Sequence, residues 1–157
     1  MPDFELTRTR EDRDRYELEG VGTLRLEGMF STRATAEAAG QQWQIGRRGF
    51  WRQLQATDAA GVVVGTFDRR LRGGGTLVWG DRELVLERAS VWRERYALAD
   101  GERELVLYEA RSWGKRPVTV TVDDPGALDP GLLLFGAFVA RSLAHDSASA
   151  GSTAAVG

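Results

Sequence analysis

The chain has 157 residues, 42% hydrophobic and 28% charged, which is enough to bury one hydrophobic core and too few for several domains. It contains no cysteine, which excludes disulfide bonds, thiol nucleophiles and thiolate metal sites and makes a reducing cytoplasm the simplest location. The net charge of −2 gives no overall attraction to nucleic acid or to anionic membranes, and we expect no nucleic-acid partner.

The N-terminal residues 1–15 mix acidic and basic side chains and lack the apolar run of a signal peptide. We therefore expect no secretion. Lys115 is the one lysine among 21 basic residues. An excess of arginine over lysine, together with abundant alanine and glycine, is typical of a GC-rich bacterial genome.

Residues 4–122 alternate apolar and polar side chains with a period of two. Val118, Val120 and Val122, for example, alternate with Thr119 and Thr121, as expected for strands with one buried face. Turn residues separate these strands at short, regular intervals, at 19–20, 58–61, 73–75, 80–81, 100–101 and 124–126. This spacing predicts an antiparallel meander or barrel and not βαβ units.

Two short segments inside this region have other compositions. Residues 35–40, with the sequence TAEAAG, have helical composition but are too few for a stable helix, so we predict a loop or a single turn there. The three glycines at 73–75 lack the Lys-Ser/Thr of a phosphate-binding loop and are interpreted as a hairpin turn.

The segment from Asp129 to His145 has the pattern of a helix that is apolar on every side. Asp129 suits the N-cap and Pro130 the first helical position, while Arg141 and His145 lie where the negative end of the helix dipole favours cations. A bilayer needs about 20 apolar residues, and the uncharged stretch 130–140 is about half as long. We predict no transmembrane span and a helix buried inside the protein.

These patterns predict a single all-β domain over residues 1–146. Its fold is a closed antiparallel barrel of about ten to twelve short strands, wrapped around one buried hydrophobic C-terminal helix at about 130–145. Residues 147–157 are small and polar and are expected to form a disordered tail. Because the helix occupies the lumen, we expect no lipid inside the barrel.

A strand, a turn containing Asp and Gly, and a second strand occur in that order at 54–67 and again at 96–108, and the apolar helix follows. This pattern resembles the tubby C-terminal-like superfamily, which includes tubby, the phospholipid scramblases and the plant LURP-one-related proteins. The resemblance covers residues 16–145 and implies a closed antiparallel barrel around a hydrophobic helix. The chain lacks the cysteine-rich segment and C-terminal transmembrane helix of scramblases and the lysines of the tubby phosphoinositide site. The resemblance therefore implies a fold more safely than it implies an activity.

Candidate catalytic residues are few and isolated. His145, the only histidine, ends the apolar helix, and no G-x-S-x-G motif surrounds Ser142 or Ser147. Asp123 and Asp124 are candidate ligands of a hard cation, and Glu102 with Glu104, or Glu83 with Glu87, is a candidate glycosidase pair. A turn explains the first pair and a solvated surface explains the others. We predict a protein that is not an enzyme and that uses no metal and no cofactor.

The arginine clusters are the main candidate binding site. They comprise Arg47, Arg48, Arg69, Arg70, Arg72, Arg93 and Arg95. Arginine binds phosphate with two parallel hydrogen bonds. By alternation Arg70, Arg72, Arg93 and Arg95 face outward, whereas Arg69 has the parity of the core and requires a bulge or a position at a barrel mouth. The alternative is a solvated face balanced by nearby carboxylates.

Aromatic residues accompany these clusters. Phe50, Trp51 and Trp79 are suited to a membrane interface or to stacking on a base. The alternative is that the five tryptophans pack in the core and at the barrel ends.

Three functions stay open at this point. The first is a cytoplasmic interaction module, peripheral to the membrane, which recognises acidic lipid headgroups or phosphorylated partners through the arginines. The second is a structural or protein-binding domain that uses exposed apolar or edge-strand surface. The third is an enzyme based on carboxylates alone.

Overall fold

The computed structural model describes residues 3–10, 12–27, 33–48, 53–70, 73–90, 93–111 and 117–156, and gives only the backbone from 147 onward. These residues form twelve strands, one 3-10 helix and one α-helix. The strands are β1 (Asp3–Arg8), β2 (Arg15–Leu18), β3 (Gly22–Glu27), β4 (Arg33–Ala38), β5 (Gln41–Arg47), β6 (Gln53–Asp58), β7 (Val63–Arg69), β8 (Gly75–Trp79), β9 (Arg82–Arg88), β10 (Arg95–Asp100), β11 (Arg103–Ala110) and β12 (Val118–Val122). The helices are η1 (Pro125–Ala127) and α1 (Pro130–Val156).

The strands form a closed antiparallel barrel in simple meander order. Each strand pairs with its neighbours in the sequence, and β1 pairs with β12 to complete the ring. In that closing pair Phe4 lies opposite Val120 and Leu6 opposite Val118. The predicted barrel is confirmed. Its closure leaves none of the described strands with an unpaired edge, so the alternative in which a partner extends an edge strand does not apply.

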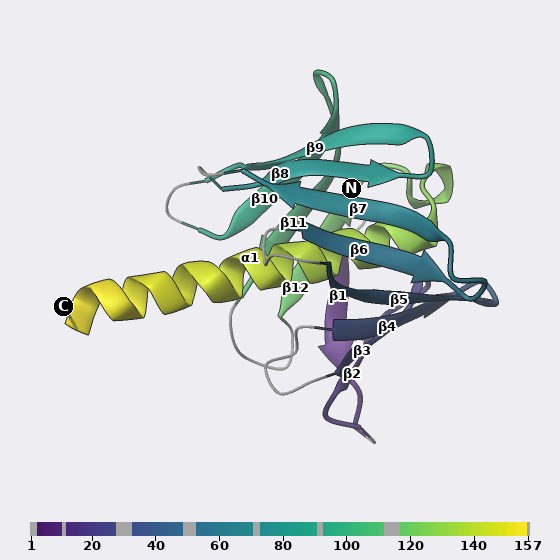
Figure 1. Ribbon diagram of the computed structural model, residues 1–157, viewed down its shortest axis with the longest axis horizontal. Coiled ribbons are helices and arrows are strands. Elements are labelled where there is room, and N and C mark those ends of the chain that lie inside the picture. Colours follow the sequence, from purple (N-terminus) through teal and green to yellow (C-terminus); the bar gives the residue numbers. More distant parts are fainter. Residues whose placement is uncertain are drawn as a thin grey trace.

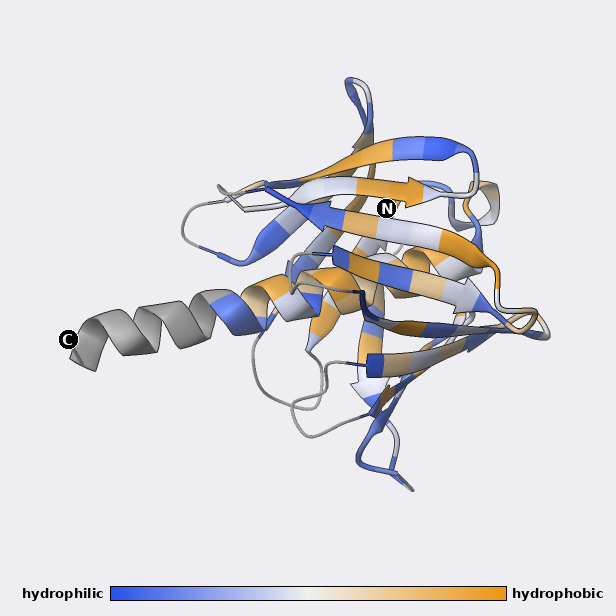
Figure 2. Ribbon diagram, in the orientation of Figure 1, coloured by the Kyte–Doolittle hydropathy of each residue, from blue (hydrophilic) through white to orange (hydrophobic). Residues whose placement is uncertain are grey.

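Helix α1 passes through the lumen of this barrel (Figure 1). Its side chains from Leu132 to Phe135 and from Ala137 to Ala140 are buried, and the inward residues of the strands pack around them. Figure 2 shows the hydrophobic part of α1 inside the ring of strands. The carboxylate of Asp129 accepts a hydrogen bond of 2.8 Å from the backbone N–H of Gly131, which confirms the predicted N-cap.

The segment 35–40 differs from its prediction. Residues 33–38 form strand β4, and a two-residue turn follows at Ala39 and Gly40. The inward side chains of β4 are Ala34, Ala36 and Ala38, all buried. Small side chains let α1 approach this wall closely, and a methyl group added to Gly22 on the adjacent β3 would lie 3.1 Å from Leu134 of α1. The alanines had suggested helical structure within this segment. In the structure, their small side chains leave space for helix α1.

The end of α1 also differs from its prediction. The helix continues past residue 145 to Val156, where a disordered tail was expected. Residues 146–156 contain several alanines and no proline, so nothing in the sequence stops the helix at His145. Arg141 is therefore an internal residue of the helix, and the explanation of its position by the helix dipole is wrong.

The predicted turns lie between the strands as expected. Gly80 and Gly101 have φ values of 62° and 63°, in the left-handed region that two-residue hairpins require at that position. Within the described part of the chain, no helix is both long enough and apolar enough to span a bilayer.

Candidate functional site

The two ends of the barrel carry opposite charge. In a meander, successive connections alternate between the two ends. At one end, which we call the arginine mouth, seven of the twelve strands begin or end with an arginine. They are Arg8, Arg15, Arg33, Arg47, Arg69, Arg88 and Arg95. The described residues of the connections at this mouth add Arg10, Arg13, Arg48, Arg70, Arg93 and Arg111.

The other end, which we call the acidic mouth, holds the short hairpins and the start of α1. Its strand ends and turns contain Asp3, Glu19, Asp58, Asp81, Asp100, Glu102, Asp123, Asp124 and Asp129, beside two arginines, Arg82 and Arg103. The net charge is only −2, but the positive and negative side chains are strongly separated along the barrel axis. Helix α1 enters at the acidic mouth and leaves through the arginine mouth (Figure 1).

The predicted arginines that the structure describes lie on one rim, spread over the ends of β5, β7 and β10. Arg47 and Arg48 end β5, and Arg69 and Arg70 end β7. One strand separates β5 from β7, so these groups start about 10 Å apart. Arg93 and Arg95 lie next along the same rim at the start of β10. Arg72 lies outside the described residues.

Carboxylates neutralise part of this rim. Glu109 lies 3.2 Å from Arg95 and 3.9 Å from Arg93. Glu94 pairs with Arg88 at 2.9 Å and accepts a hydrogen bond from the hydroxyl of Tyr96. Burial raises the pKa of that hydroxyl, and Glu94 raises it further. Arg88, Arg93 and Arg95 therefore all form ion pairs with neighbouring carboxylates.

Arg69 confirms its predicted position at a barrel mouth. It has the inward parity of Phe67, and its Nη1 lies 2.7 Å from Oδ2 of Asp146 on α1. This ion pair joins the end of β7 to the helix where the helix leaves the barrel.

Three of the predicted arginines keep their charge available. Arg47, Arg48 and Arg70 are exposed, and no described carboxylate lies within ion-pair distance of them. Arg70 makes one weak hydrogen bond, 3.4 Å long, to the hydroxyl of Thr76. These three residues form what we call the free rim.

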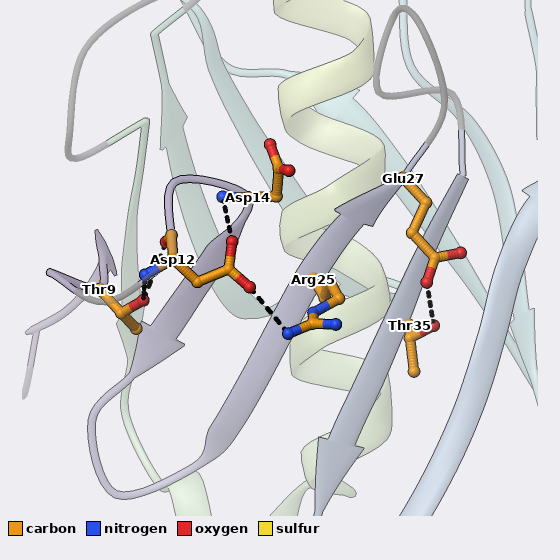
Figure 3. A network of polar contacts seen from close by, with 6 residues as sticks. All are labelled: Thr9, Asp12, Asp14, Arg25, Glu27 and Thr35. Atoms are coloured by element: carbon orange, nitrogen blue, oxygen red, sulfur yellow. Dashed lines mark hydrogen bonds and ion pairs between the residues drawn. The ribbon is translucent and has the colours of Figure 1, made fainter.

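A polar network holds the opposite side of the same mouth (Figure 3). One carboxylate oxygen of Asp12 lies 2.7 Å from Nη2 of Arg25, and the other accepts the backbone N–H of Asp14 at 2.9 Å. Thr35 donates to Glu27 at 3.1 Å on the neighbouring strands. Asp12 therefore fixes the β1–β2 connection against the outer wall, and its charge is already balanced.

Sequence reasoning missed two arginines on the inner side of the arginine mouth. Arg8 shares the inward parity of Leu6, and its guanidinium lies over the ring of Tyr16, 5.8 Å from the centroid. Arg141 lies half-buried on α1 beside them, and its pKa is influenced by both. The parity of Arg8 was the available signal. For Arg141, the signal was a charge within an otherwise apolar helix.

The aromatic candidates divide between core and undescribed residues. Trp79 is 7% exposed and packs against Trp43 and Phe135 with ring centroids 6.0 and 5.8 Å apart. It forms part of the wall of a hollow of about 830 Å³ at the acidic mouth, at the opposite end of the barrel from the predicted arginine clusters. A role for Trp79 at a membrane interface beside them is therefore wrong. Phe50 and Trp51 lie outside the described residues.

The catalytic candidates do not converge. His145 is exposed, and Ser142 donates its hydroxyl proton to the carbonyl of Phe138 at 2.9 Å. Glu83, Glu87, Glu102 and Glu104 are all exposed. Among the residues that the structure describes, no three acidic or histidine side chains come together as metal ligands.

Comparisons with known proteins return no relative. No family model, no characterised protein and no solved structure matches this chain. The resemblance to the tubby C-terminal-like superfamily stays a prediction, and the argument for a function depends on the charge geometry of the two mouths.

Proposed function

We propose that this protein is a non-enzymatic module that binds anionic membrane surfaces through its arginine mouth. The observation that carries the proposal is the separation of charge along the barrel axis. Arginines end seven strands at one mouth, whereas aspartates and glutamates fill the connections at the other. An anionic surface attracts the first end and repels the second, which gives the bound protein a single orientation.

The spacing of the charges favours a surface over a single soluble ligand. The free rim spans the ends of β5 and β7, which start about 10 Å apart, a separation of about the Debye length at 0.1 M salt. Headgroups beside the projecting end of α1 can supply a separate phosphate to each of these arginines. A soluble phosphorylated partner is the competing source of the same chemistry.

The packed lumen supports attachment at the periphery. Side chains of α1 fill the barrel, so a lipid chain has no cavity to enter there. The proposed location is therefore the membrane surface that faces the cytoplasm, with the exit of α1 directed toward the headgroups. The tubby-like barrel belongs to the same proposal.

The experiment is vesicle cosedimentation with the full chain. A basic side chain near an anionic surface contributes about 1 kcal/mol. A variant with Arg47→Ala, Arg48→Ala and Arg70→Ala should therefore lose about 3 kcal/mol, or about 100-fold in partitioning onto vesicles that contain phosphatidylserine. The matched control is Arg82→Ala with Arg103→Ala at the acidic mouth, which removes arginines and should not weaken binding.

Salt and vesicle composition decide the result. Binding of the unchanged protein should fall steeply as salt increases and should vanish on vesicles of phosphatidylcholine alone. Equal loss in the free-rim and control variants would contradict the proposal, because orientation would then not matter. Binding to a soluble phosphopeptide but to no vesicle would assign the arginine mouth to a phosphorylated protein instead.

A further inference from the structure

We propose that Arg8, Tyr16 and Arg141 form a binding site for one phosphate-bearing anion on the inner side of the arginine mouth. The site lies between β1, β2 and α1, inside the ring of strand ends. It is separate from the free rim, and its chemistry does not depend on the membrane proposal. A phosphate monoester suits it, either on a lipid headgroup or as a free group.

Arg8 is held in place by an aromatic ring and keeps hydrogen-bond donors unused. Its guanidinium lies 5.8 Å from the ring centroid of Tyr16, and Nη2 makes a long hydrogen bond of 3.4 Å to the hydroxyl of that residue. The Nε atom is buried and has no hydrogen-bond partner. A buried donor without an acceptor destabilises the protein unless a ligand supplies the acceptor.

Arg141 adds a second positive charge on the part of α1 that leaves the barrel through the arginine mouth. It lies on α1 between the buried residues Ala140 and Leu143. Burial lowers the pKa of its guanidinium, Tyr16 raises it and the charge of Arg8 lowers it again. A guanidinium that lowers the pKa of another lies close enough to repel it.

No described carboxylate lies within ion-pair distance of either arginine, although Glu17 lines the same surface hollow as Arg8. The nearest acidic residue along α1 is Asp146, which is paired with Arg69 at 2.7 Å. Five residues along an α-helix correspond to a rotation of about 140° from Arg141, so Asp146 faces a different part of the barrel. The ion pairs of the described residues include neither Arg8 nor Arg141.

A doubly charged oxyanion matches this arrangement. It balances both guanidinium charges and supplies oxygens to the planar donors of two arginines, as phosphate does in arginine clusters generally. The hydroxyl of Tyr16 offers a third donor. Without the anion the two arginines repel each other, whereas with the anion they bind it together.

The first test measures thermal unfolding in inorganic phosphate and in chloride at equal ionic strength, with calorimetric titration of phosphate. At ten times the dissociation constant, phosphate should raise the unfolding temperature of the unchanged protein by about 3–5 °C. Arg8→Gln and Arg141→Gln should each abolish this rise and weaken binding at least tenfold. Arg103→Gln at the acidic mouth is the matched control and should keep both.

Stability without phosphate provides an independent readout. Removing one of two facing cations relieves repulsion, so both variants should unfold in chloride at or above the temperature of the unchanged protein. Arg141→Met keeps the aliphatic stem of the side chain and serves if the glutamine variant packs poorly. Lower stability in chloride for Arg8→Gln and for Arg141→Met would show that these arginines are structural, and would overturn the proposal.

A second arm identifies the source of the phosphate group. Phosphatidic acid is a phosphomonoester lipid, whereas phosphatidylserine is not. If the protein binds vesicles with phosphatidic acid more tightly than vesicles with phosphatidylserine, and Arg141→Gln loses this preference, the site is assigned to a lipid headgroup. Saturable binding of inorganic phosphate without that preference assigns it to a soluble phosphomonoester. Absence of both in the unchanged protein overturns the proposal. Failure of phosphatidylserine vesicles to bind affects only the membrane proposal, so the two results are distinguishable.

Discussion

Replacing Gly136 with alanine tests whether α1 occupies the barrel in the observed register. A methyl group at Gly136 would lie 2.1 Å from the hydroxyl oxygen of Tyr108 and 2.5 Å from the ring carbon that bears it. Tyr108 is fully buried on β11, and its hydroxyl donates to the carbonyl of Leu133 at 3.3 Å. The ring cannot move aside without losing that hydrogen bond.

The expected loss follows from three effects. Overpacking a core costs about 1–3 kcal/mol, and a lost buried hydrogen bond costs about 1–2 kcal/mol. Alanine recovers about 1 kcal/mol through its higher helix propensity. We therefore expect Gly136→Ala to lower the free energy of unfolding by about 1–4 kcal/mol, which is about 2–16 °C in Tm for a chain of this size.

The assay is urea and thermal unfolding followed by tryptophan fluorescence. Gly46→Ala is the matched control, because its methyl group would meet only Arg33 at 3.5 Å; it should leave stability unchanged or higher. Adding Tyr108→Phe to Gly136→Ala removes the closest atom and should restore part of the loss. If Gly136→Ala were as stable as the unchanged protein or more so, then α1 would not face β11 in this register, and the reasoning about the central helix would be refuted.

Three further predictions concern the cap, the buried tyrosines and the helix exit. Asp129→Ala should lower stability by about 1 kcal/mol in urea unfolding, because it removes the N-cap of α1, whereas Asp129→Asn should be close to neutral. Burial raises the pKa of the hydroxyls of Tyr96 and Tyr108 above the ordinary value of 10.0. Above pH 10.0 these hydroxyls therefore lose their protons in the unfolded chain but keep them in the folded chain, so the free energy of unfolding should fall as the pH rises. Each of the two tyrosines should increase the unfolding equilibrium constant up to tenfold per pH unit, and Tyr108→Phe should remove one such share. Asp146→Asn should cost less than about 1 kcal/mol, because its ion pair with Arg69 is partly exposed, and a larger drop in the urea midpoint would contradict this.

The architecture was predictable because two strong patterns agree. The alternation at 118–122 and in the other strands fixes which faces are buried, and the apolar helix at 130–140 is too short for a bilayer and so must enter a core. Strand β4 was missed because alanine favours a helix by its intrinsic propensity. Its three inward side chains must be small because α1 packs directly against them. This requirement comes from contacts between residues that are far apart in the sequence.

The candidate site was only partly predictable, for a similar reason. Arginines near strand ends are visible in the sequence, but the partners that neutralise them depend on register. Arg95 meets Glu109 across a strand pair, and Arg69 meets Asp146, which is 77 residues away. Arg8 was overlooked because its significance depends on Arg141 of α1. The position of Arg141 had been explained by a helix end near His145, whereas the helix ends at Val156.

The polarity of the barrel follows from the chemistry of its connections. The tight hairpins at the acidic mouth need aspartate and glycine for their geometry, so carboxylates accumulate there as a consequence of folding. The longer connections at the other mouth carry no such requirement, and the strand ends beside them are arginines instead. In the part of the chain that the structure describes, side chains of α1 fill the lumen, so we expect a ligand to bind on the surface of the barrel. The arginine mouth is the part of that surface where the charges are not explained by turn geometry, and this is why the proposed binding is placed there.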